Sequence, residues 1–346
     1  MSTLLSVENV RASYRLSNGV ALQAVDGVSL ELRRGEVLGV VGESGCGKST
    51  LATILALNAA PPLIVSEGTL EVQGRHADLT KSQPLPRSER GKLISVLPQS
   101  AMNSINPTTR VRDLAFDVLR AHERIGRKAA WNRAGARLEQ LGLPTRVLEQ
   151  YPHQLSGGMR QRVITVISTL LDPAILIADE PTSALDVSSQ RAVIEMLRDL
   201  LKREIISGVL FITHDLPLLH QIADRVAVMY AGKIAELGPT ERVINRPEHP
   251  YARALVGSIL VPEPQIRARV VKGIPGSPPD LADMPQGCRF HPRCSLANDR
   301  CLQDPPEVGD STHFAACWRT FEAHVEGKPP VALRPAGNVT EAGRLS

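Results

Sequence analysis

Apolar residues along the chain form alternating stretches, short continuous runs and helical repeats, which predict strands, buried strands and helices respectively. The strands are expected at residues 6–16, 28–36, 36–42, 174–179 and 208–213. The helices are expected from Lys48 onward, at 156–171 and at 188–203. Short apolar strands that alternate with helices are typical of an α/β fold with a largely parallel sheet.

One stretch interrupts this alternation. The pattern from Arg110 to Gly142 is helical throughout, which predicts an inserted helical subdomain at about residues 100–165. After Leu260 the sequence becomes dense in proline and glycine, as in a linker or an extended arm. The last residues cannot bury much apolar surface and are expected to be disordered. The expected division is therefore 1–260, 261–324 and a tail at 325–346.

The composition limits the class of protein. With 346 residues, 42% of them hydrophobic and 22% charged, the chain can form two domains of an ordinary soluble globular protein. A net charge of +4 suits a nucleotide, nucleic acid or lipid surface as partner, although an ordinary solvated surface explains it equally well. The chain has no uninterrupted run of 18 apolar residues and no secretory signal, so we expect it in the cytoplasm, with reduced thiols.

The sequence GESGCGKST, at residues 42–50, matches the phosphate-loop pattern G-x-x-x-x-G-K-[ST] between a predicted strand and a predicted helix. Its glycines allow backbone N–H groups to surround phosphate oxygens, and the helix N-terminus adds its dipole. Lys48 can reach the β- and γ-phosphates, and the Ser49 hydroxyl can bind Mg²⁺. The expected phosphate-binding residues are Gly42, Ser44, Gly45, Cys46, Gly47, Lys48, Ser49 and Thr50.

Cys46 lies within this loop and is interpreted as a small filler residue. The start of a helix can lower the pKa of a thiol. We therefore expect a maleimide to modify Cys46 and block ATP binding, and we expect ATP to protect the thiol.

Two acidic residues are adjacent at the end of a predicted strand. Asp179 is the last residue of the strand AILIAD, and Glu180 follows it directly. Burying two acids at the end of an apolar strand is unfavourable unless they have a function. Asp179 suits a water-mediated contact to Mg²⁺, and Glu180 suits a base that orients the attacking water. The pair is a weak signal alone and a strong one together with the phosphate loop.

The sequence LSGGMRQR at 155–162 resembles the signature motif of ABC-type ATPases, and further landmarks of that family follow in order. Gln99 matches the Q-loop, Asp186 ends the D-loop SALD, and His214 matches the switch histidine. Tyr14 matches the aromatic residue that stacks on adenine, with an ordinary core position as the alternative.

The resemblance covers about residues 4–260 and implies an ATPase that binds ATP and Mg²⁺. In this family the residues matching Glu180 and His214 are catalytic. Mg²⁺ is expected to be held through Ser49, Gln99 and Asp179.

Ser156, Gly157 and Gly158 open a predicted helix, so their N–H groups form a second anion site. Since the chain already has one phosphate loop, a second site makes sense if it serves a nucleotide bound by another subunit. The resemblance implies such an arrangement, in which two domains sandwich two ATP molecules head to tail. A plain helix cap is the alternative role for Ser156.

Three segments resemble the ATPase subunits of dipeptide and oligopeptide permeases: NSINP at 103–107, PEHPYARALVGSIL at 247–260 and the sequence at 273–294. This resemblance implies a peripheral protein on the cytoplasmic face of the inner membrane. The implied partners are two integral membrane permeases, a second and related ABC ATPase subunit and, indirectly, a solute-binding protein. Nickel or oligosaccharide importers of the same subfamily are the alternatives.

Four of the five cysteines lie close to the C-terminal end, with five, six and fifteen residues between them. They are Cys288, Cys294, Cys301 and Cys317. No C-x₂₋₄-C knuckle typical of zinc ribbons is present, and four thiolates can hold a 4Fe–4S cluster. The permease resemblance supports the cluster, with Zn²⁺ or free buried thiols as alternatives. Since no catalytic motif lies in this region, we expect ATP hydrolysis to depend little on it.

Two other functions compete with transport. The basic segment 122–137 raises the possibility of a soluble ABC ATPase that acts on nucleic acid. Aromatic residues that could stack on bases are scarce, at 3%, and charged helices usually form solvated faces, so no nucleic acid partner is expected. A regulator that binds ATP without hydrolysing it is disfavoured because Glu180 and His214 are intact.

Overall fold

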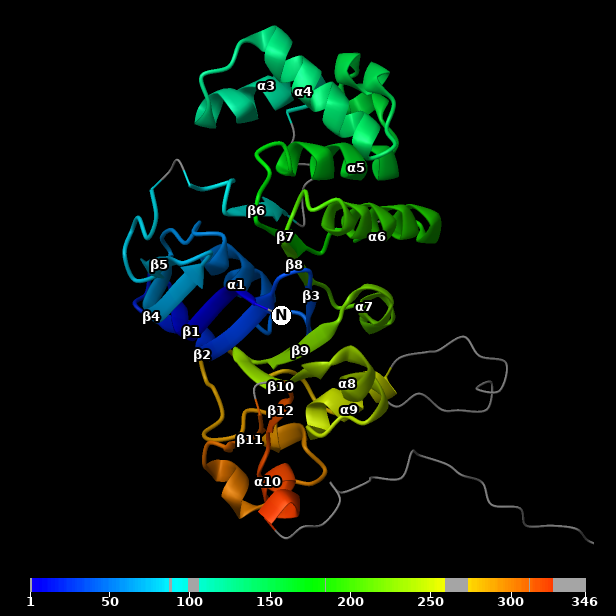
Figure 1. Cartoon of the computed structure of the whole chain (residues 1–346). Helices are drawn as coiled ribbons and strands as arrows, with labels where there is room; N and C mark the ends of the chain where they lie inside the picture. Colours follow the sequence, from blue (N-terminus) through cyan, green and yellow to red (C-terminus); the bar gives the residue numbers. More distant parts are fainter. Residues whose placement is uncertain are drawn as a thin grey trace, which may run out of the picture.

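The computed structural model describes residues 2–86, 89–98, 106–183, 185–258, 273–310 and 312–325. Figure 1 shows a helical part at one end, two sheets in the middle and a smaller C-terminal unit at the other end. We call residues 273–325 of that unit the extension. Gln99, the segment 103–105 and the tail from 326 onward lie outside the described residues.

The first sheet has four antiparallel strands in the order β2-β1-β4-β5. Its strands are β1 (Thr3–Arg15), β2 (Ala21–Arg33), β4 (Leu63–Val72) and β5 (Arg75–Asp78). Val10 and Val25 are fully buried on its inner face, as expected for strands that are covered on one side. The alternation at 6–16 and 28–36 thus predicted two strands that the structure contains.

The second sheet has eight strands in the order β11-β12-β10-β9-β3-β8-β7-β6. The strands from β9 to β6 are parallel, and β10, β12 and β11 continue the sheet antiparallel. The strands are β3 (Val37–Val41), β6 (Ile94–Leu97), β7 (Ile175–Asp179), β8 (Gly208–Ile212), β9 (Arg225–Tyr230), β10 (Lys233–Pro239), β11 (Glu307–Gly309) and β12 (Phe314–Ala316). Every residue of β3, β7 and β8 is buried, which explains their continuous apolar sequences.

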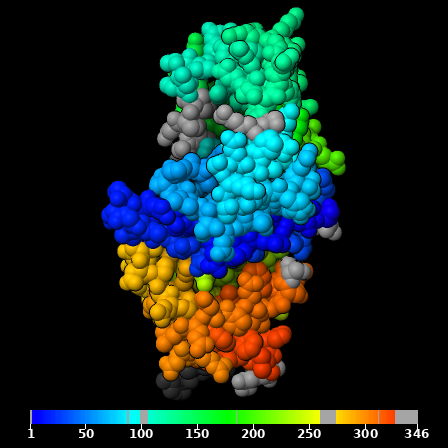
Figure 2. Space-filling view, turned by 90° about the vertical axis from the view of Figure 1, so that its left-hand side faces the viewer, coloured from blue at the N-terminus to red at the C-terminus, as the bar shows by residue number. Residues whose placement is uncertain are grey.

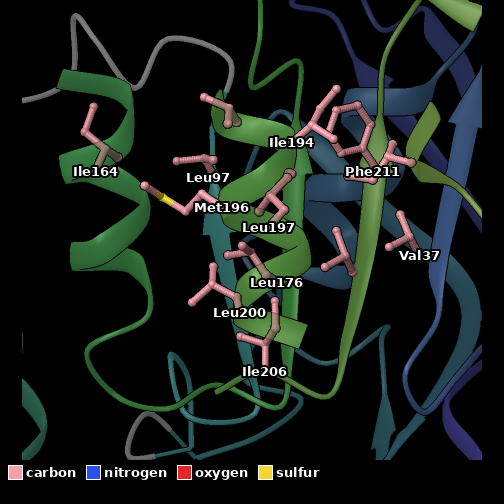
Figure 3. Packing of buried hydrophobic residues seen from close by; sticks show 14 of the residues in the cluster. Val37, Leu97, Ile164, Leu176, Ile194, Met196, Leu197, Leu200, Ile206 and Phe211 are labelled. Carbon is pink, nitrogen blue, oxygen red and sulfur yellow. The ribbon is translucent and has the colours of Figure 1, made fainter. Parts of the chain in front are cut away.

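Helices pack around the second sheet. They are α1 (Lys48–Leu55), α5 (Gly157–Ser168), α6 (Val187–Lys202), α7 (Leu216–Ile222), α8 (Thr240–Asn245) and α9 (Pro250–Gly257). Of these, α1, α5, α6 and α7 lie in the connections between its parallel strands, and α8 and α9 follow β10. Figure 3 shows how α6 lies against the sheet, with Leu197 and Leu200 beside Leu176 of β7, and Met196 pointing toward Ile164 of α5. None of the described helices is both long and apolar enough to cross a membrane.

The helical part contains two antiparallel helices, α3 (Val111–His122) and α4 (Arg127–Gln140), followed by the 3₁₀ turns η1 (Thr145–Glu149) and η2 (Pro152–Gln154). The sequence predicted a helical pattern throughout 110–142, and within it the chain is extended at Glu123 and at Gly126. This break lets α4 fold back on α3, so that Leu119 and Ala130 share one core. The predicted helical subdomain is therefore built around a helical hairpin.

The extension adds to the second sheet instead of forming only an extended arm. It contains η4 (His291–Arg293), η5 (Asp299–Leu302), β11, β12 and α10 (Trp318–Val325). β12 pairs with β10 and β11, and Ala315 of β12 and Val308 of β11 are buried. Figure 2 shows the orange and red extension packed directly below the blue first sheet. The proline- and glycine-rich pattern did not predict these strands, because each is only three residues long.

Candidate nucleotide-binding site

The phosphate loop connects β3 to α1 and is supported from below by backbone carbonyls. A side-chain carbon on Gly42 would lie 2.1 Å from the Met229 carbonyl oxygen, and one on Gly47 would lie 2.2 Å from that of Ala24. Gly47 also has a φ of 103°, in the left-handed region that favours glycine. Only glycine fits at these two positions, and the resulting turn leaves the opposite side of the loop open to a ligand.

The side chain of Lys48 bridges backbone carbonyl groups of the phosphate loop. Its Nζ donates hydrogen bonds to the carbonyl oxygens of Gly42, at 2.7 Å, and Glu43, at 2.9 Å. The residue is only 7% exposed, so its charge sits within the loop rather than in bulk water. This arrangement holds a positive point charge where the phosphates of a nucleotide would bind.

Ser49 and Asp179 approach each other from α1 and the end of β7. The Ser49 hydroxyl donates to Oδ1 of Asp179 at 3.2 Å. Burial raises the pKa of Asp179, and the adjacent Glu180 carboxylate contributes to the rise. A divalent cation beside Asp179 would relieve both effects, so the donor set fits Mg²⁺.

Glu180 lies one residue beyond the same strand and contacts the switch histidine. Its Oε1 is 2.7 Å from Nδ1 of His214, and Glu180 is 8% exposed whereas the His214 side chain is 68% exposed. Glu180 has a φ of 50°, an unfavourable conformation for a residue with a side chain. The backbone hydrogen bond from Glu180 N–H to the Ile212 carbonyl, at 2.9 Å, holds it there. The structure therefore brings together the two residues that the sequence identified as catalytic.

Ser156 caps α5, since its hydroxyl accepts a hydrogen bond from the Met159 N–H at 3.3 Å. Ser156 therefore acts as a helix cap, which was the alternative role considered for it. Since Ser156 is exposed, the N-terminus of α5 is also accessible from outside. A side-chain carbon on Gly158 would lie 2.5 Å from the Ser189 hydroxyl of α6, so this glycine allows α5 and α6 to meet. Asp186 caps α6 by accepting from Ser189 N–H at 3.0 Å, and it also accepts from the hydroxyls of Ser188 and Ser189. The Ser188 hydroxyl first, and then the N–H and hydroxyl of Ser189, hold the pKa of Asp186 well below its usual range.

Tyr14 lies at the edge of the phosphate loop region. Its hydroxyl is 3.2 Å from the Thr50 hydroxyl at the start of α1, and its ring packs partly against the core of the first sheet. The residue is half-buried, so part of its ring remains available.

Several residues beneath the phosphate loop were not found from the sequence. The Tyr251 hydroxyl of α9 accepts a hydrogen bond from the Glu43 N–H at 2.8 Å, and Tyr251 packs against Tyr230 and Phe290. Arg293 of the extension binds the Glu43 carboxylate. No local spacing signals these contacts, because up to 250 residues separate the partners along the chain.

The four late cysteines lie in the extension, where Cys288 and Cys294 pack against the hydrophobic core that contains Tyr251 and Phe290. Burial raises the pKa of Cys288 to about 12, and the thiols of the other three add to the rise through their negative charge when ionised. The pKa of Cys317 is likewise raised, mainly by burial. Within the described ranges, no three or more His, Cys, Asp or Glu side chains are already arranged to hold a metal ion. The thiols are therefore close enough to interact, but they do not surround a common point.

Two family models match the chain. Residues 25–183 match the model described as ABC transporter, and residues 235–301 match the one described as oligopeptide/dipeptide transporter, C-terminal region.

Curated relatives match over nearly the whole length. The dipeptide transport ATP-binding protein DppD of Bacillus subtilis is 40% identical over 324 residues, which are 92% of this chain and 95% of that protein. The oligopeptide transport ATP-binding protein OppD of Bacillus subtilis is 39% identical over 341 residues, with 96% and 94% covered. OppD of Escherichia coli is 38% identical over 327 residues, with 92% and 94% covered.

Solved structures share the fold at lower identity. The dimeric post-hydrolysis state of the ATP-binding cassette MJ0796, bound to ADP and Pi, has a TM-score of 0.58 at 23% identity and covers 68% of this chain and 98% of its own. CbiO1 of Clostridium perfringens, part of the ABC transporter complex cbiONQ, has a TM-score of 0.60 at 23% identity, with 71% and 92% covered.

The fold, the phosphate loop and the paired carboxylates define an ATPase of the ATP-binding cassette class. The chain belongs to the ABC transporter family, in the group of dipeptide and oligopeptide transport ATP-binding proteins.

The expectation that Cys46 has a lowered pKa is wrong. Cys46 is only 5% exposed, and burial raises its pKa more than the nearby Lys48 charge lowers it. The argument from helix position considered the charge of the helix end and neglected the loss of water around the thiol.

In the native chain at pH 7, maleimide should therefore modify Cys46 at least about tenfold more slowly than in the denatured chain, because little thiolate is present and access is poor. Mass spectrometry of the peptide that contains Cys46 measures the rate. A Val187→Cys variant is the control, since Val187 is 82% exposed and its thiol should react quickly. Equal rates at the two cysteines would contradict the placement of Cys46.

Proposed function

We propose that ATP hydrolysis by this chain energises a membrane importer of dipeptides or oligopeptides. The mechanism rests on one observation, the placement of Glu180 and His214 beside the Ser49–Asp179 pair. The substrate class rests on the match of residues 235–301 to the C-terminal model of oligopeptide and dipeptide transporters. Nickel and oligosaccharides remain the alternative substrates.

The residues around the phosphate loop have distinct roles in this proposal. Lys48 binds the β- and γ-phosphates, and Tyr14 stacks on the adenine. Ser49, Asp179 and Gln99 would hold Mg²⁺, which would supply positive charge to the phosphates. Backbone N–H groups of the loop complete the phosphate contacts, including those at Gly42, Ser44, Gly45, Cys46, Gly47 and Thr50.

Glu180 acts as the base that orients the attacking water and accepts its proton. Its fixed backbone conformation and its contact with His214 keep the carboxylate in one direction, so little reorganisation is needed during the reaction. His214 is mostly exposed, which leaves its other ring nitrogen free to approach the γ-phosphate.

A second subunit completes the site in this proposal. Ser156, Gly157 and Gly158 of one chain contact the γ-phosphate bound by the other, and Asp186 lies at the same interface. The exposed N-terminus of α5 supports this role, since its free N–H groups and dipole favour an anion. A related ATPase subunit is the favoured partner.

The remaining partners follow from the relatives named above. We infer two integral membrane permeases, with the ATPase at the cytoplasmic face of the inner membrane and a solute-binding protein acting indirectly. Residues 1–260 would form the ATPase domain and 261–324 the permease-type C-terminal region.

Nucleic acid is not a proposed partner, because the basic segment binds acids of the same chain. Arg127 donates to Asp113, and Arg133 donates to Glu123. Arg137 is bound to Asp172 and to the Thr169 carbonyl. These guanidinium groups are already committed within the protein and are poorly placed to neutralise phosphates.

The cysteines of the extension are proposed to hold a 4Fe–4S cluster, with Zn²⁺ as the alternative metal. Four soft sulfur donors suit either group. The supporting observations are the burial of Cys301 and Cys317 and the mutual effect of the thiols on their pKa values. A metal centre would bind the sulfurs as thiolates and cross-link a unit that has only short strands.

Glu180→Gln is expected to lower steady-state ATP hydrolysis by about a hundredfold or more, because the amide cannot accept the proton. ATP binding should be retained, so an ATP-bound dimer with the partner ATPase subunit should accumulate in the assembled complex. The matched control is Glu195→Gln on the exposed face of α6, which should leave hydrolysis unchanged. Turnover of Glu180→Gln close to that of the control would refute the catalytic role.

The same variant tests the transport function in host cells. Replacement of the chromosomal gene by the Glu180→Gln form should abolish uptake of a labelled dipeptide or oligopeptide and leave uptake of nickel and oligosaccharides intact. Loss of nickel or oligosaccharide uptake with normal peptide uptake would reject the peptide assignment in favour of that alternative.

Protein purified without oxygen is expected to contain about four iron atoms per chain, since four thiolates bind one cubane cluster. Cys288→Ser, Cys294→Ser, Cys301→Ser and Cys317→Ser should each lose the iron and expose the extension to proteases. Cys46→Ser is the control and should keep both the iron content and the protease resistance of the extension. One zinc ion per chain and no iron would reject the 4Fe–4S cluster but would still support a metal centre that cross-links the extension. The absence of any bound metal would reject both the cluster and the metal cross-link.

A further inference from the structure

A buried arginine of the extension, Arg293, contacts the phosphate loop directly. Arg293 donates from Nη1 to Oε2 of Glu43 at 2.6 Å and from Nη2 to Oε1 at 3.0 Å. This is a two-pronged guanidinium–carboxylate pair, which fixes direction as well as distance. The side chains are 6% and 23% exposed, so solvent screens the pair less than an ion pair on the surface.

Glu43 is the second residue of the phosphate loop, and its backbone takes part in the site. Its carbonyl oxygen accepts the hydrogen bond from Lys48 Nζ, and its N–H donates to the Tyr251 hydroxyl. The same residue therefore carries the contact to the extension and the contact to the phosphate-binding lysine. If the Glu43 side chain changed direction, its backbone carbonyl would shift, and Lys48, which is hydrogen-bonded to that carbonyl, would shift with it.

The charge of Glu43 also matters for a ligand that carries several negative charges. An unpaired carboxylate within the phosphate loop would repel the phosphates at short range. Arg293 neutralises it, and the Tyr230 hydroxyl, 3.2 Å from Nη1 of Arg293, lies on the same side.

A second arginine of the extension supports the loop at its other end. Arg289 donates to the Ala231 carbonyl and to Asp26. The next residue along, Gly232, donates its N–H to the Cys46 carbonyl at 2.9 Å. The phosphate loop is thus contacted directly at Glu43 and, through one intervening peptide, at Cys46.

We propose that Arg293 is a positioning residue of the nucleotide site, which holds the phosphate loop through Glu43 and makes ATP affinity depend on the folded extension. Arg293 ends the turn η4 between Cys288 and Cys294, so the order of the cysteine-bearing unit sets the place of its guanidinium. This revises the expectation that the ATPase reaction depends little on the extension.

The test is a double-mutant cycle on the ATP dissociation constant of the full-length chain, measured with a fluorescent ATP analogue in the presence of Mg²⁺. Arg293→Met should weaken binding about tenfold, within the usual range of coupling between two sites. In a chain that already carries Glu43→Gln, Arg293→Met should weaken binding by less than about threefold, because the partner charge is gone.

Arg319→Met is the matched control. Arg319 is also an extension arginine, but it binds the Leu296 carbonyl and Glu322 within the extension itself. This variant should change ATP affinity by less than about twofold if only the contact to the phosphate loop matters. A thermal unfolding curve for each variant separates loss of folding from loss of affinity.

If Arg293→Met does not fold, the same double-mutant cycle on ATP affinity is measured with Arg293→Lys. Lysine retains the charge but cannot form two parallel bonds, so we expect about a threefold loss of affinity that is absent in the Glu43→Gln chain. Equal losses with and without the Glu43 carboxylate, or losses no larger than those of Arg319→Met, would overturn the proposal. Because the readout is nucleotide binding by the chain itself, this result is independent of which solute is transported.

Discussion

The close contact between the phosphate loop and the backbone beneath it is the constraint on which the rest of the structure depends. Gly42 and Gly47 lie so close to the carbonyls of Met229 and Ala24 that any side chain there would collide with backbone. The loop must therefore turn its N–H groups away from the sheet. That turn creates an anion site at the start of α1 and leaves Lys48 to supply charge from inside the loop.

Ser49 and Asp179 lie close together because the parallel strands end at the same edge of the sheet. β3 leads into the phosphate loop and β7 ends at Asp179, so the two side chains form a hydrogen bond although they are far apart in the sequence. Glu180 follows in a left-handed conformation that points its carboxylate to His214. The cost of that conformation is tolerable because the surrounding buried strands hold the backbone in place.

Much of this site could be predicted from the sequence, because its residues lie in short continuous motifs. The phosphate loop, the acid pair and the first turn of α5 each combine spacing with local structure. The Arg293–Glu43 pair could not be predicted in this way, since its partners are 250 residues apart and neither alone is unusual. The raised pKa of Cys46 was missed for a related reason, as burial depends on packing from distant strands.

We propose that one chain holds only half of each ATP site and that the N-terminus of α5 completes the site of another subunit. Hydrogen–deuterium exchange of the Glu180→Gln protein, which should bind ATP without hydrolysing it, tests this arrangement. With Mg²⁺ and ATP, amides at 42–50 should be protected both in the dilute isolated chain and in the complex purified with its permeases. Amides at 156–160 should be protected only in the complex. Two results would contradict this shared site. One is protection of the amides at 156–160 in the isolated chain equal to that in the complex, and the other is no protection of these amides in the ATP-bound complex.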